Sequence, residues 1–432
     1  MSRRQRGAFP GALEAKAASC IMLARGGHDM IEWSEQHLQI RELVRRFVEA
    51  EIRPNLEALE HGDEPPYGVL RKLFATFGLK EMGKQRFHAE LRRAERGESK
   101  SDEPRSGGGD AVALQLLPVI ELSRYCPGMV TALGVSVGLT AGAIMKKGTR
   151  AQKERWALDL LTLDKIGAWA ITEPGSGSDA FGGMKATARR DGDGYVLNGS
   201  KTFITNGPYA DTLVFICKLD TGEAESARKV VSFVLDRGTP GLTQSKPLRK
   251  MGMHSSPTGE LFLEDVRVGR DQLLGETEDT SARAGAKETF TAERTGVAAM
   301  ALGIVEQCLM LSTAYAQERV AFGRPIGEFQ LIQLKLAKME VARMNIQNLV
   351  YRIIELAEAG KSMDLAEASA CKLYTAGAAM EVALEAVQLF GGNGYMAEFQ
   401  VEQLARDAKV LQIYGGTDEI QVSQIARTLL SR

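Results

Sequence analysis

Glu293 is a carboxylate on the apolar side of a predicted helix. In the stretch TFTAERTGVAAMALGIVEQCL it shares helical spacing with Val297, Met300, Ile304 and Cys308. An unpartnered carboxylate is costly on an apolar face, which makes Glu293 a candidate for a functional role. The plainer interpretation is a face charge that happens to begin the helix, where acidic residues suit the helix dipole.

The stretch QIYGGTDEI (412–420) reads as a tight polar turn between two helical segments. Two adjacent glycines, Gly415 and Gly416, let the backbone pass close to a flat or bulky ligand. Gly415 offers no side chain, so any chemistry at that position must use its backbone.

Two further stretches combine hydroxyl groups with glycine or an aromatic ring. In AWAITEPGSGSDAFGG (168–183), Thr172, Ser176, Ser178 and free N–H groups make a donor-rich loop, suited to a planar acceptor-rich ligand or a phosphate. An ordinary turn is the alternative. In KTFITNGPYAD (201–211), Phe203 stands beside Thr205 at a strand end, either as core or as a stacking face for a ring.

Two glycine-containing stretches follow helices near the C-terminus. In ERVAFGRPIGEFQ (318–330), Arg319 is either a solvated charge or a phosphate contact. QLFGGNGYMAEF (388–399) resembles a helix C-cap with a left-handed glycine, and that structural interpretation suffices for it alone.

Three successive regions of the sequence, distinguished by their hydrophobic periodicity, must position these residues. Apolar residues recur at helical spacing from Glu35 to about Phe77 and from 111 to 161, with turns at 126–128 and 147–149. Residues 168–275 alternate as strands, with a hairpin turn at 191–194. The helical period returns after Ala284, broken near 359–361 and 391–394. This α, β, α order lacks βαβ alternation and disfavours a Rossmann fold.

Composition excludes several other classes of protein. A chain of 432 residues predicts two or three domains, and its net charge of −1 gives no basic field for nucleic acid or membrane. The five cysteines lack a Cys-x-x-Cys motif, and the five histidines are dispersed, so we expect no disulfide framework and no metal site. No apolar run approaches the ~20 residues of a membrane helix.

Two segments stand apart from this pattern. Residues 1–31 are Arg-rich and predict a disordered or transit-like extension, or an untranslated stretch before a start at Met30. Residues 84–110 are highly charged and then glycine-rich, which predicts a solvated or disordered insertion without chemistry.

From about Glu32 to Arg432 the order of these motifs resembles the acyl-CoA dehydrogenase family, carried by AITEPGSGSD, FITNG, MGMHSSPTGELFLEDVRV, ERVAFGRPIGEFQ, QLFGGNGY and RDAKVLQIYGGTDEIQ. The resemblance implies an α+β multidomain fold: a helical N-terminal domain (32–167), a middle β-barrel domain (168–280) and a C-terminal four-helix bundle (281–432). It implies FAD-dependent oxidation of an acyl-CoA to trans-2-enoyl-CoA, as in fatty acid β-oxidation.

The resemblance also implies the cofactor contacts, in which Phe203 replaces the family's usual Trp and Arg319 reaches the FAD pyrophosphate across a subunit interface. The implied FAD-binding residues are Trp169, Ala170, Ile171, Thr172, Gly177, Ser178, Phe203, Ile204, Thr205, Arg319, Phe322, Gln330, Gln388, Leu389, Phe390, Gly391, Gly392, Thr417, Asp418 and Glu419. A cofactor shared in this way implies a homotetramer, built as a dimer of dimers.

The same resemblance addresses Gly415. Most members carry the catalytic glutamate there, whereas the isovaleryl-CoA and long-chain enzymes have glycine or alanine and take the base from a Glu-Arg pair like Glu293-Arg294. It implies Glu293 as base and the Gly415 N–H, with a flavin ribityl hydroxyl, as donors to the thioester oxygen. The implied substrate-binding residues are Ser178, Thr291, Ala292, Glu293, Arg294, Gly415 and Gly416.

We expect electrons to pass to an electron-transfer flavoprotein, in the bacterial cytoplasm or, in a eukaryote, the mitochondrial matrix. Alternatives are a flavin oxidase or monooxygenase of the same fold, or a catalytically silent flavin- or CoA-binding homologue. The usual Pro-x-x-Tyr-Gly-Gly segment is absent, and Ala284 stands roughly where the isovaleryl enzyme has an aromatic residue near its substrate.

Overall fold

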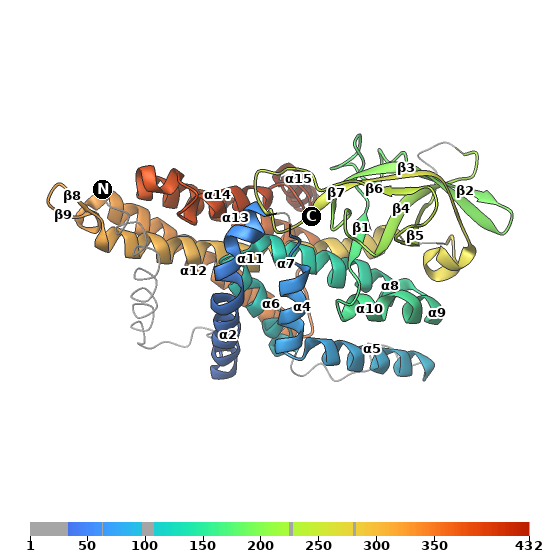
Figure 1. Cartoon of the computed structure of the whole chain (residues 1–432), viewed down its shortest axis with the longest axis horizontal. Coiled ribbons are helices and arrows are strands. Elements are labelled where there is room, and N and C mark those ends of the chain that lie inside the picture. The colour runs from blue at the N-terminus through green and yellow to red at the C-terminus, as the bar shows by residue number, and fades with distance from the viewer. Residues whose placement is uncertain (1–32, 63, 97–107, 224–227, 280–281, 432) are drawn as a thin grey trace.

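The chain folds as helices, then a curled sheet, then helices again (Figure 1). The computed structural model describes residues 33–62, 64–96, 108–223, 228–279 and 282–431, with the backbone alone at 108 and 282–290. The predicted order of helical, β and helical regions is confirmed. The predictions for residues 1–31 fall outside this described part.

The N-terminal region is built from helices, several of which continue as π-helical turns at Val48–Ile52, Gly134–Ala141 and Lys153–Ala157. Side-chain caps fix two of the helix starts: Ser34 accepts from the His37 N–H, and Thr149 forms a capping box with Gln152. The helices are α2 (Glu35–Phe47), α3 (Leu56–His61), α4 (Tyr67–Thr76), α5 (Leu79–Glu95), α6 (Gly108–Ser123), α7 (Pro127–Leu133), α8 (Gly142–Lys147), α9 (Arg150–Gln152) and α10 (Leu158–Leu161).

Helix α5 corrects the prediction that residues from 84 onward are solvated or disordered. Residues 84–95 belong to this helix, whose Phe87 and Leu91 are 2% and 8% exposed. These two side chains are one turn apart and pack with Trp156 and Leu160. The high charge of the segment concealed this pair, because the charged side chains occupy the other faces of the helix. Residues 97–107 lie outside the described part of the chain.

The middle region is one sheet of seven strands, β1 (Gly167–Ala170), β2 (Thr187–Asp191), β3 (Gly194–Thr205), β4 (Thr212–Asp220), β5 (Val230–Asp236), β6 (Leu242–Gln244) and β7 (Thr258–Val268). β4 pairs in parallel with β1 and β2 along one edge and antiparallel with β5 along the other. β3 joins β2 to β7, and the predicted hairpin turn lies where Asp191 pairs with Gly194. The inner face is apolar, which closes the sheet around its own core.

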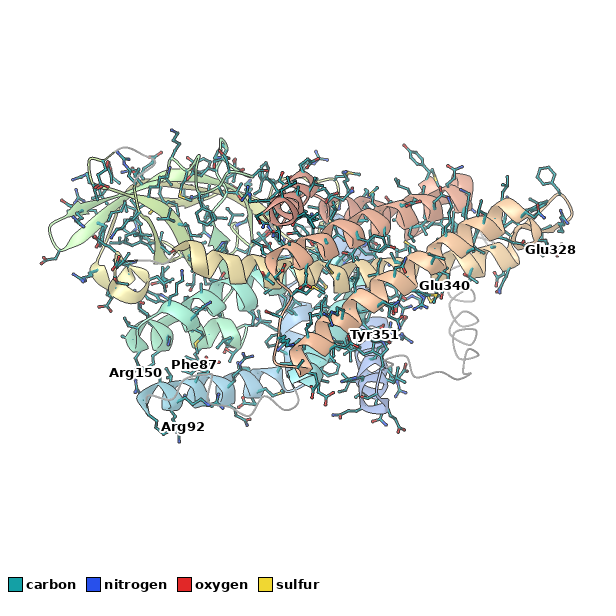
Figure 2. All side chains as sticks on the ribbon, turned by 180° about the vertical axis from the view of Figure 1, so that it is seen from behind. Phe87, Arg92, Arg150, Glu328, Glu340 and Tyr351 are labelled. Carbon is teal, nitrogen blue, oxygen red and sulfur yellow. The ribbon has the colours of Figure 1, made fainter. Side chains whose placement is uncertain are left out.

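The C-terminal region contains α11 (Ala282–Glu318), the short hairpin β8 (Val320–Ala321) and β9 (Arg324–Pro325), α12 (Gln330–Glu358), α13 (Leu365–Phe390), α14 (Val401–Val410) and α15 (Asp418–Leu430). The predicted breaks are present after Glu358 and Phe390, where Gly360 and Gly391 take positive φ. The β8–β9 hairpin is at the end of the molecule opposite the sheet, and Glu328 marks the same tip from behind (Figures 1 and 2).

Two helical stretches, Pro127–Lys147 and Thr291–Glu318, are long and apolar enough by length and composition to cross a membrane. The sequence analysis did not anticipate them, because each contains polar residues between its apolar ones. Of the most apolar window in the second stretch, 78% is buried inside the protein, as expected of a core helix.

Asn206 joins the sheet to the N-terminal helices. Its amide donates to the carbonyls of Ala132 and Gly167, both at 2.9 Å, and its carbonyl oxygen accepts from the Tyr67 hydroxyl at 2.9 Å. The residue is fully buried and has φ of 63°, a left-handed conformation that asparagine tolerates better than most residues. This anchor places the end of β3, with Phe203 to Thr205, against α4, α7 and β1.

Candidate active site

The structure brings Glu293 and Gly415 together from segments 122 residues apart. A β-carbon built on Gly415 would lie 3.4 Å from Cδ and 3.5 Å from Oε1 of Glu293. The carboxylate of α11 therefore occupies space beside the bare backbone of the 412–418 loop. Gly415 and Gly416 have φ of 62° and 89°, which explains two glycines there.

Glu293 lies on the apolar stripe that its spacing predicts, since Val297, Met300, Ile304 and Cys308 are all buried. It is 11 residues from the start of α11, so the alternative of an acid in the first helical turn is wrong. Among the described residues its carboxylate makes no hydrogen bond or ion pair.

Burial raises the pKa of the half-buried Glu293 carboxyl, and the positive charges of Arg294 and Lys372 oppose that rise. A carboxylate that lacks a hydrogen-bond partner and has a raised pKa is well matched to accepting a proton. Arg294 is buried, and its guanidinium donates to Ser369 Oγ at 2.9 Å. Next to Glu293 in sequence, Ala292 is exposed and Thr291 is half-buried.

The two predicted ring-binding stretches lie side by side. The Thr202 N–H donates to the Thr172 carbonyl at 2.9 Å, and Lys201 Nζ donates to the Ile171 carbonyl at 3.0 Å. Buried Lys201 also pairs with Glu173 at 2.8 Å, which fixes the start of the 172–178 loop on β3. Within that loop Thr172 is half-buried, whereas Gly177 and Ser178 are exposed.

Phe203 is suited to a planar ligand. Its side chain is 69% exposed, although the neighbouring Thr202 and Ile204 are buried, and its φ is 57°. Left-handed backbone is rare and strained for an aromatic residue, and such strain gathers at ligand sites. An exposed aromatic ring on the strand that pairs with the start of the 172–178 loop fits the face of a flavin ring.

Four predicted cofactor residues have buried side chains: Ala170, Ile204, Leu389 and Phe390. Ala170 and Ile204 belong to the core of the sheet, and the Phe390 ring stacks on Tyr315 with centroids 4.0 Å apart. These residues can meet a ligand through their backbone groups rather than their side chains.

A second group of predicted residues lies at the other end of α11. Arg319 and Gln330 are exposed, and Phe322 is 96% exposed with φ of 52°. Tyr315 and Asn393 connect this end to the segment 388–392: the Tyr315 hydroxyl donates to the Phe390 carbonyl at 3.4 Å and accepts from Asn393 at 3.0 Å. Gln388, Gly391 and Gly392 are exposed there.

These two groups are far apart within one chain. Glu293 and Arg319 are 26 residues apart on and just beyond one continuous helix, which corresponds to roughly 39 Å at 1.5 Å per residue. One chain therefore does not bring Arg319 to the ligand that Phe203, Glu293 and Gly415 can contact.

Thr417, Asp418 and Glu419 lie at the start of α15, directly after the glycine loop. Thr417 is its N-cap residue, Asp418 is half-buried and Glu419 is exposed. Sequence analysis missed two residues that hold this loop, Lys372 and Gln421. Lys372 had a visible signal, because it is a lysine among Ala368, Cys371 and Ala376 on the buried face of a helix.

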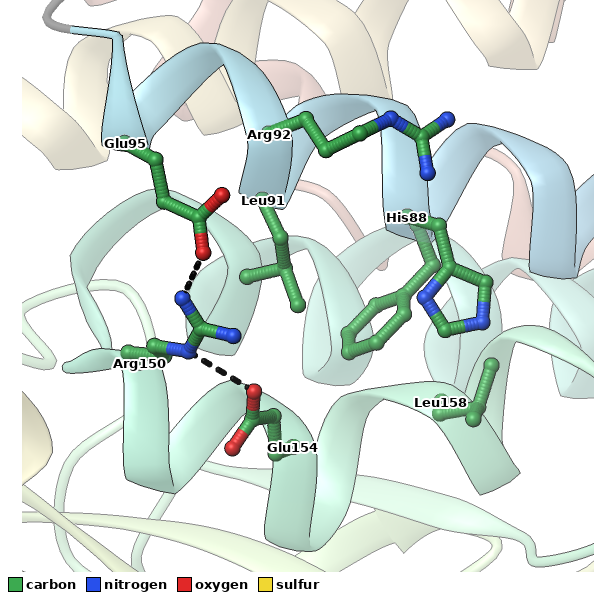
Figure 3. A pocket seen from close by; sticks show the side chains of 8 residues that line it. His88, Leu91, Arg92, Glu95, Arg150, Glu154 and Leu158 are labelled. Atoms are coloured by element: carbon green, nitrogen blue, oxygen red, sulfur yellow. Dashed lines mark hydrogen bonds and ion pairs between the residues drawn. The ribbon is translucent and has the colours of Figure 1, made fainter.

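A pocket of about 460 Å³ lies elsewhere, between α5 and the helices α9 and α10 (Figure 3). Phe87, Leu91 and Leu158 are apolar residues of its lining, and Arg150, which also lines it, bridges Glu95 and Glu154. No predicted site residue lines it. The candidate catalytic residues therefore lie around Glu293 and Gly415 and not in this pocket.

The site thus combines an exposed aromatic ring, Phe203, next to the 172–178 loop with a half-buried carboxylate, Glu293, beside the backbone of Gly415. The sequence matches three families described as acyl-CoA dehydrogenase N-terminal, middle and C-terminal domains, over residues 99–164, 168–266 and 284–430. The chain belongs to the acyl-CoA dehydrogenase family.

Several characterised relatives span most of the chain. A short-chain specific acyl-CoA dehydrogenase from Megasphaera elsdenii is 40% identical over 323 residues, 75% of this chain and 83% of that protein. An acyl-CoA dehydrogenase from Bacillus subtilis is 37% identical over 397 residues, 92% of this chain and 98% of that protein.

Solved structures share the whole fold. Butyryl-CoA dehydrogenase from Megasphaera elsdenii has a TM-score of 0.77 at 34% identity, covering 93% of this chain and all of that one. An acyl-CoA dehydrogenase from Bacillus anthracis, solved with FAD, has a TM-score of 0.76 at 30% identity, covering 93% of this chain and 68% of that one.

Two other similar structures differ in their described activity. One comes from work on the electron transferring flavoprotein of Acidaminococcus fermentans, with a TM-score of 0.78 at 33% identity over 93% of this chain and all of that one. The other is the prolyl acyl carrier protein oxidase AnaB, with a TM-score of 0.75 at 30% identity over 92% of this chain and all of that one.

As a family member, the protein is an FAD-dependent oxidoreductase that acts on acyl-CoA. The predictions of fold class, enzyme class and cofactor are confirmed. The roles of individual site residues remain predictions.

Proposed function

We propose that the protein oxidises an acyl-CoA thioester to its trans-2-enoyl-CoA with Glu293 as the catalytic base. The observation that carries this proposal is the Glu293 carboxylate beside Gly415, 3.4 Å from the position of a β-carbon at that glycine. A base on α11 and a base on the loop would reach the same space. The absence of a side chain at Gly415 is therefore compatible with catalysis.

The chemistry divides between the two residues. The α-hydrogen of a thioester is a weak acid, so its removal needs a base and a donor to the carbonyl oxygen. Glu293 accepts the α-proton on its carboxylate, and the Gly415 N–H donates to the developing negative charge on the thioester oxygen. FAD, when bound, accepts the β-hydrogen as a hydride. The apolar neighbours of Glu293 exclude water and keep its proton affinity high.

We infer that each cofactor is held by two chains. Trp169 to Ser178 and Phe203 to Thr205 would hold the ring, whereas Arg319, Phe322, Gln330 and 388–392 would come from a second copy, because they lie at the far end of α11. Exposed apolar residues on α12 support self-association: Leu331, Leu334, Val341 and Met344 are 44–75% exposed. The assembly that follows is a dimer of dimers, which the mass of the FAD-bound protein in solution tests.

The proposed electron acceptor is an electron-transfer flavoprotein. A similar structure belongs to work on such a flavoprotein, whereas another is an oxidase, so direct reaction with oxygen is the second candidate. Reoxidation of the substrate-reduced protein separates them. A dehydrogenase is reoxidised slowly by air and quickly by the flavoprotein, whereas an oxidase releases stoichiometric peroxide at its turnover rate.

The function is tested by mixing the protein with a panel of acyl-CoA thioesters under anaerobic conditions. We expect at least one thioester to bleach the flavin absorbance, and Glu293→Gln to slow that bleaching by about 10²–10⁴-fold, the usual range for a positioned base. FAD content and binding of a CoA thioether should persist in this near-isosteric variant. Bleaching by Glu293→Gln at the wild-type rate would exclude Glu293 as the base, and no bleaching of the wild type would favour a silent homologue.

A further inference from the structure

Lys372 of α13 is a buried cation that contacts the end of the 412–418 loop. Its side chain is fully buried, and Nζ lies 3.2 Å from Asp418 Oδ1. The other carboxylate oxygen of Asp418 accepts from Gln412 Nε2 at 3.0 Å, and the Asp418 N–H donates to the Gln412 carbonyl at 3.1 Å. Asp418 thus joins the two ends of the 412–418 loop, and Lys372 ties that junction to α13.

Gln421 supplies a second anchor from within α15. Its fully buried side-chain amide donates to the carbonyls of Gly415 and Gly416, at 3.2 and 2.7 Å. Tyr414, just before the glycines, donates to Met300 Sδ at 3.3 Å. These contacts hold both neighbours of Gly415, and the Gln412–Asp418 junction holds the ends of the loop that carries its N–H.

The charge on Lys372 also acts on the base. The charges that act on Glu293 are those of Arg294 on its own helix and Lys372 on α13, whose ion-pair partner is Asp418 on α15; Glu293 in turn acts on the Tyr414 hydroxyl of the loop. Both cations lower the pKa of Glu293 against the effect of burial. Burying an ammonium group is costly, and a structural link alone could use a neutral hydrogen bond. The positive charge of Lys372 pairs with Asp418 and acts on Glu293 as well.

We propose that Lys372 is a positioning residue for the reaction, which holds the Gly415 loop through Asp418 and keeps Glu293 ionised in its apolar surroundings. This inference rests on the proposed function, because it assumes that ionised Glu293 is the base. It assigns Lys372 no contact with substrate or cofactor. Asp418 partly compensates the positive charge of Lys372 through their ion pair.

The inference predicts shifts of opposite sign in two variants. Lys372→Met removes a cation near Glu293, so the acid limb of the pH profile for flavin reduction should move up by about one pH unit. Asp418→Asn keeps a hydrogen-bonding side chain but leaves Lys372 uncompensated, so the same limb should move down. Lys372→Arg keeps the charge and should return the limb toward its wild-type position.

A measurement that does not depend on turnover tests the positioning role. Hydrogen–deuterium exchange of residues 412–418, without substrate, should be at least several-fold faster in Lys372→Met and Asp418→Asn than in the wild type and in Lys372→Arg. Any variant that fails to fold is replaced by the others, since each of the two substitutions carries its own prediction.

Unchanged exchange together with an unchanged acid limb in the folded variants would overturn the role of Lys372. That result differs from a failure of the proposed function. If Glu293 is not the base, Glu293→Gln reduces the flavin normally, whereas if only this inference fails, Glu293→Gln is slow and the Lys372 variants behave as the wild type.

Discussion

At the scale of single residues, the Glu293 carboxyl fills the space that a side chain at Gly415 would enter. A β-carbon at Gly415 would contact the Glu293 carboxyl, so the two positions compete for one space. Gly415→Glu alone should therefore crowd two carboxylates together and raise the pKa of the pair, which slows proton abstraction at neutral pH.

Moving the base tests this geometry. The double variant Glu293→Gly, Gly415→Glu should recover measurable flavin reduction that Glu293→Gly alone lacks, because the new side chain enters the vacated space. We expect less than the wild-type rate, since a non-glycine residue at φ of 62° costs about 1–2 kcal/mol. The measurement is stopped-flow flavin reduction for the two single variants and the double variant. A double variant as slow as Glu293→Gly would mean that the two positions do not serve the same proton.

The sequence singled out the candidate base and the candidate ring, but not the residues that hold the loop beside them. Glu293 was visible because a carboxylate interrupted an apolar stripe, and Phe203 because an aromatic stood among hydroxyls. Gln421 gave no such signal, because a glutamine near the start of a helix is ordinary. Its role depends on the carbonyl directions of Gly415 and Gly416, which spacing does not encode.

At the scale of elements, close contact between α6 and α11 supports the helix that carries Glu293. A β-carbon on Gly303 would lie only 2.2 Å from the Ile120 carbonyl oxygen, so the helices touch through backbone there. Gly296, two turns earlier on α11, has no atom within 4 Å of its β-carbon position. An added methyl group would therefore clash at Gly303 and meet open space at Gly296, although both glycines lie on one helix.

Gly303→Ala should lower stability by about 1–3 kcal/mol, the usual cost of overpacking, because α6 or α11 must move. Gly296→Ala is the matched control and should leave the unfolding midpoint unchanged or raise it, since alanine is favoured over glycine within helices. Thermal unfolding of both variants checks this. Equal midpoints for the two variants would mean that the contact with Ile120 adapts without cost.

Elements with one clear apolar face were predictable, and those stabilised by few contacts were not. The α11 stripe and the β2–β3 hairpin follow directly from periods of 3.6 and 2 residues. Helix α5 was missed, because Phe87 and Leu91 are its only buried side chains and most of its surface is charged. The parallel pairing of β4 with β1 and β2 could not be predicted either, since it depends on how segments distant in the sequence meet.

At the scale of the whole molecule, a buried acidic cluster joins all three regions of the chain. Glu60 of α3 is 5% exposed and neither carboxylate oxygen makes a hydrogen bond among the described residues. Asp407 of α14 is fully buried and accepts from the Met253 N–H, next to His254, whose Nδ1 lies 3.6 Å from Glu60 Oε2. Movement of any one region would expose this cluster to water.

This cluster should make stability depend on pH. Burial, and then the charge of Asp407, raise the pKa of Glu60 to about 8, while Arg406 and Lys250 lower it and Glu402 raises it. Its ordinary pKa is 4.5, so between pH 5 and 8 the folded chain holds a proton that the unfolded chain releases. Raising the pH through this window therefore favours unfolding, and stability should fall until about pH 8.

Glu60→Gln tests this dependence, because glutamine resembles the protonated acid at every pH. Its thermal unfolding midpoint should exceed that of the wild type by an amount that grows from pH 5.5 to pH 8. Glu57→Gln, on the exposed side of the same helix, is the matched control and should follow the wild type throughout. Above pH 8 the lowered pKa of Lys250, about 8 and caused chiefly by burial, adds a slope of opposite sign, so the comparison ends there. A constant difference between wild type and Glu60→Gln from pH 5.5 to 8 would show that Glu60 stays ionised in the folded protein, in which case the three regions meet around a charge that its neighbours fully compensate.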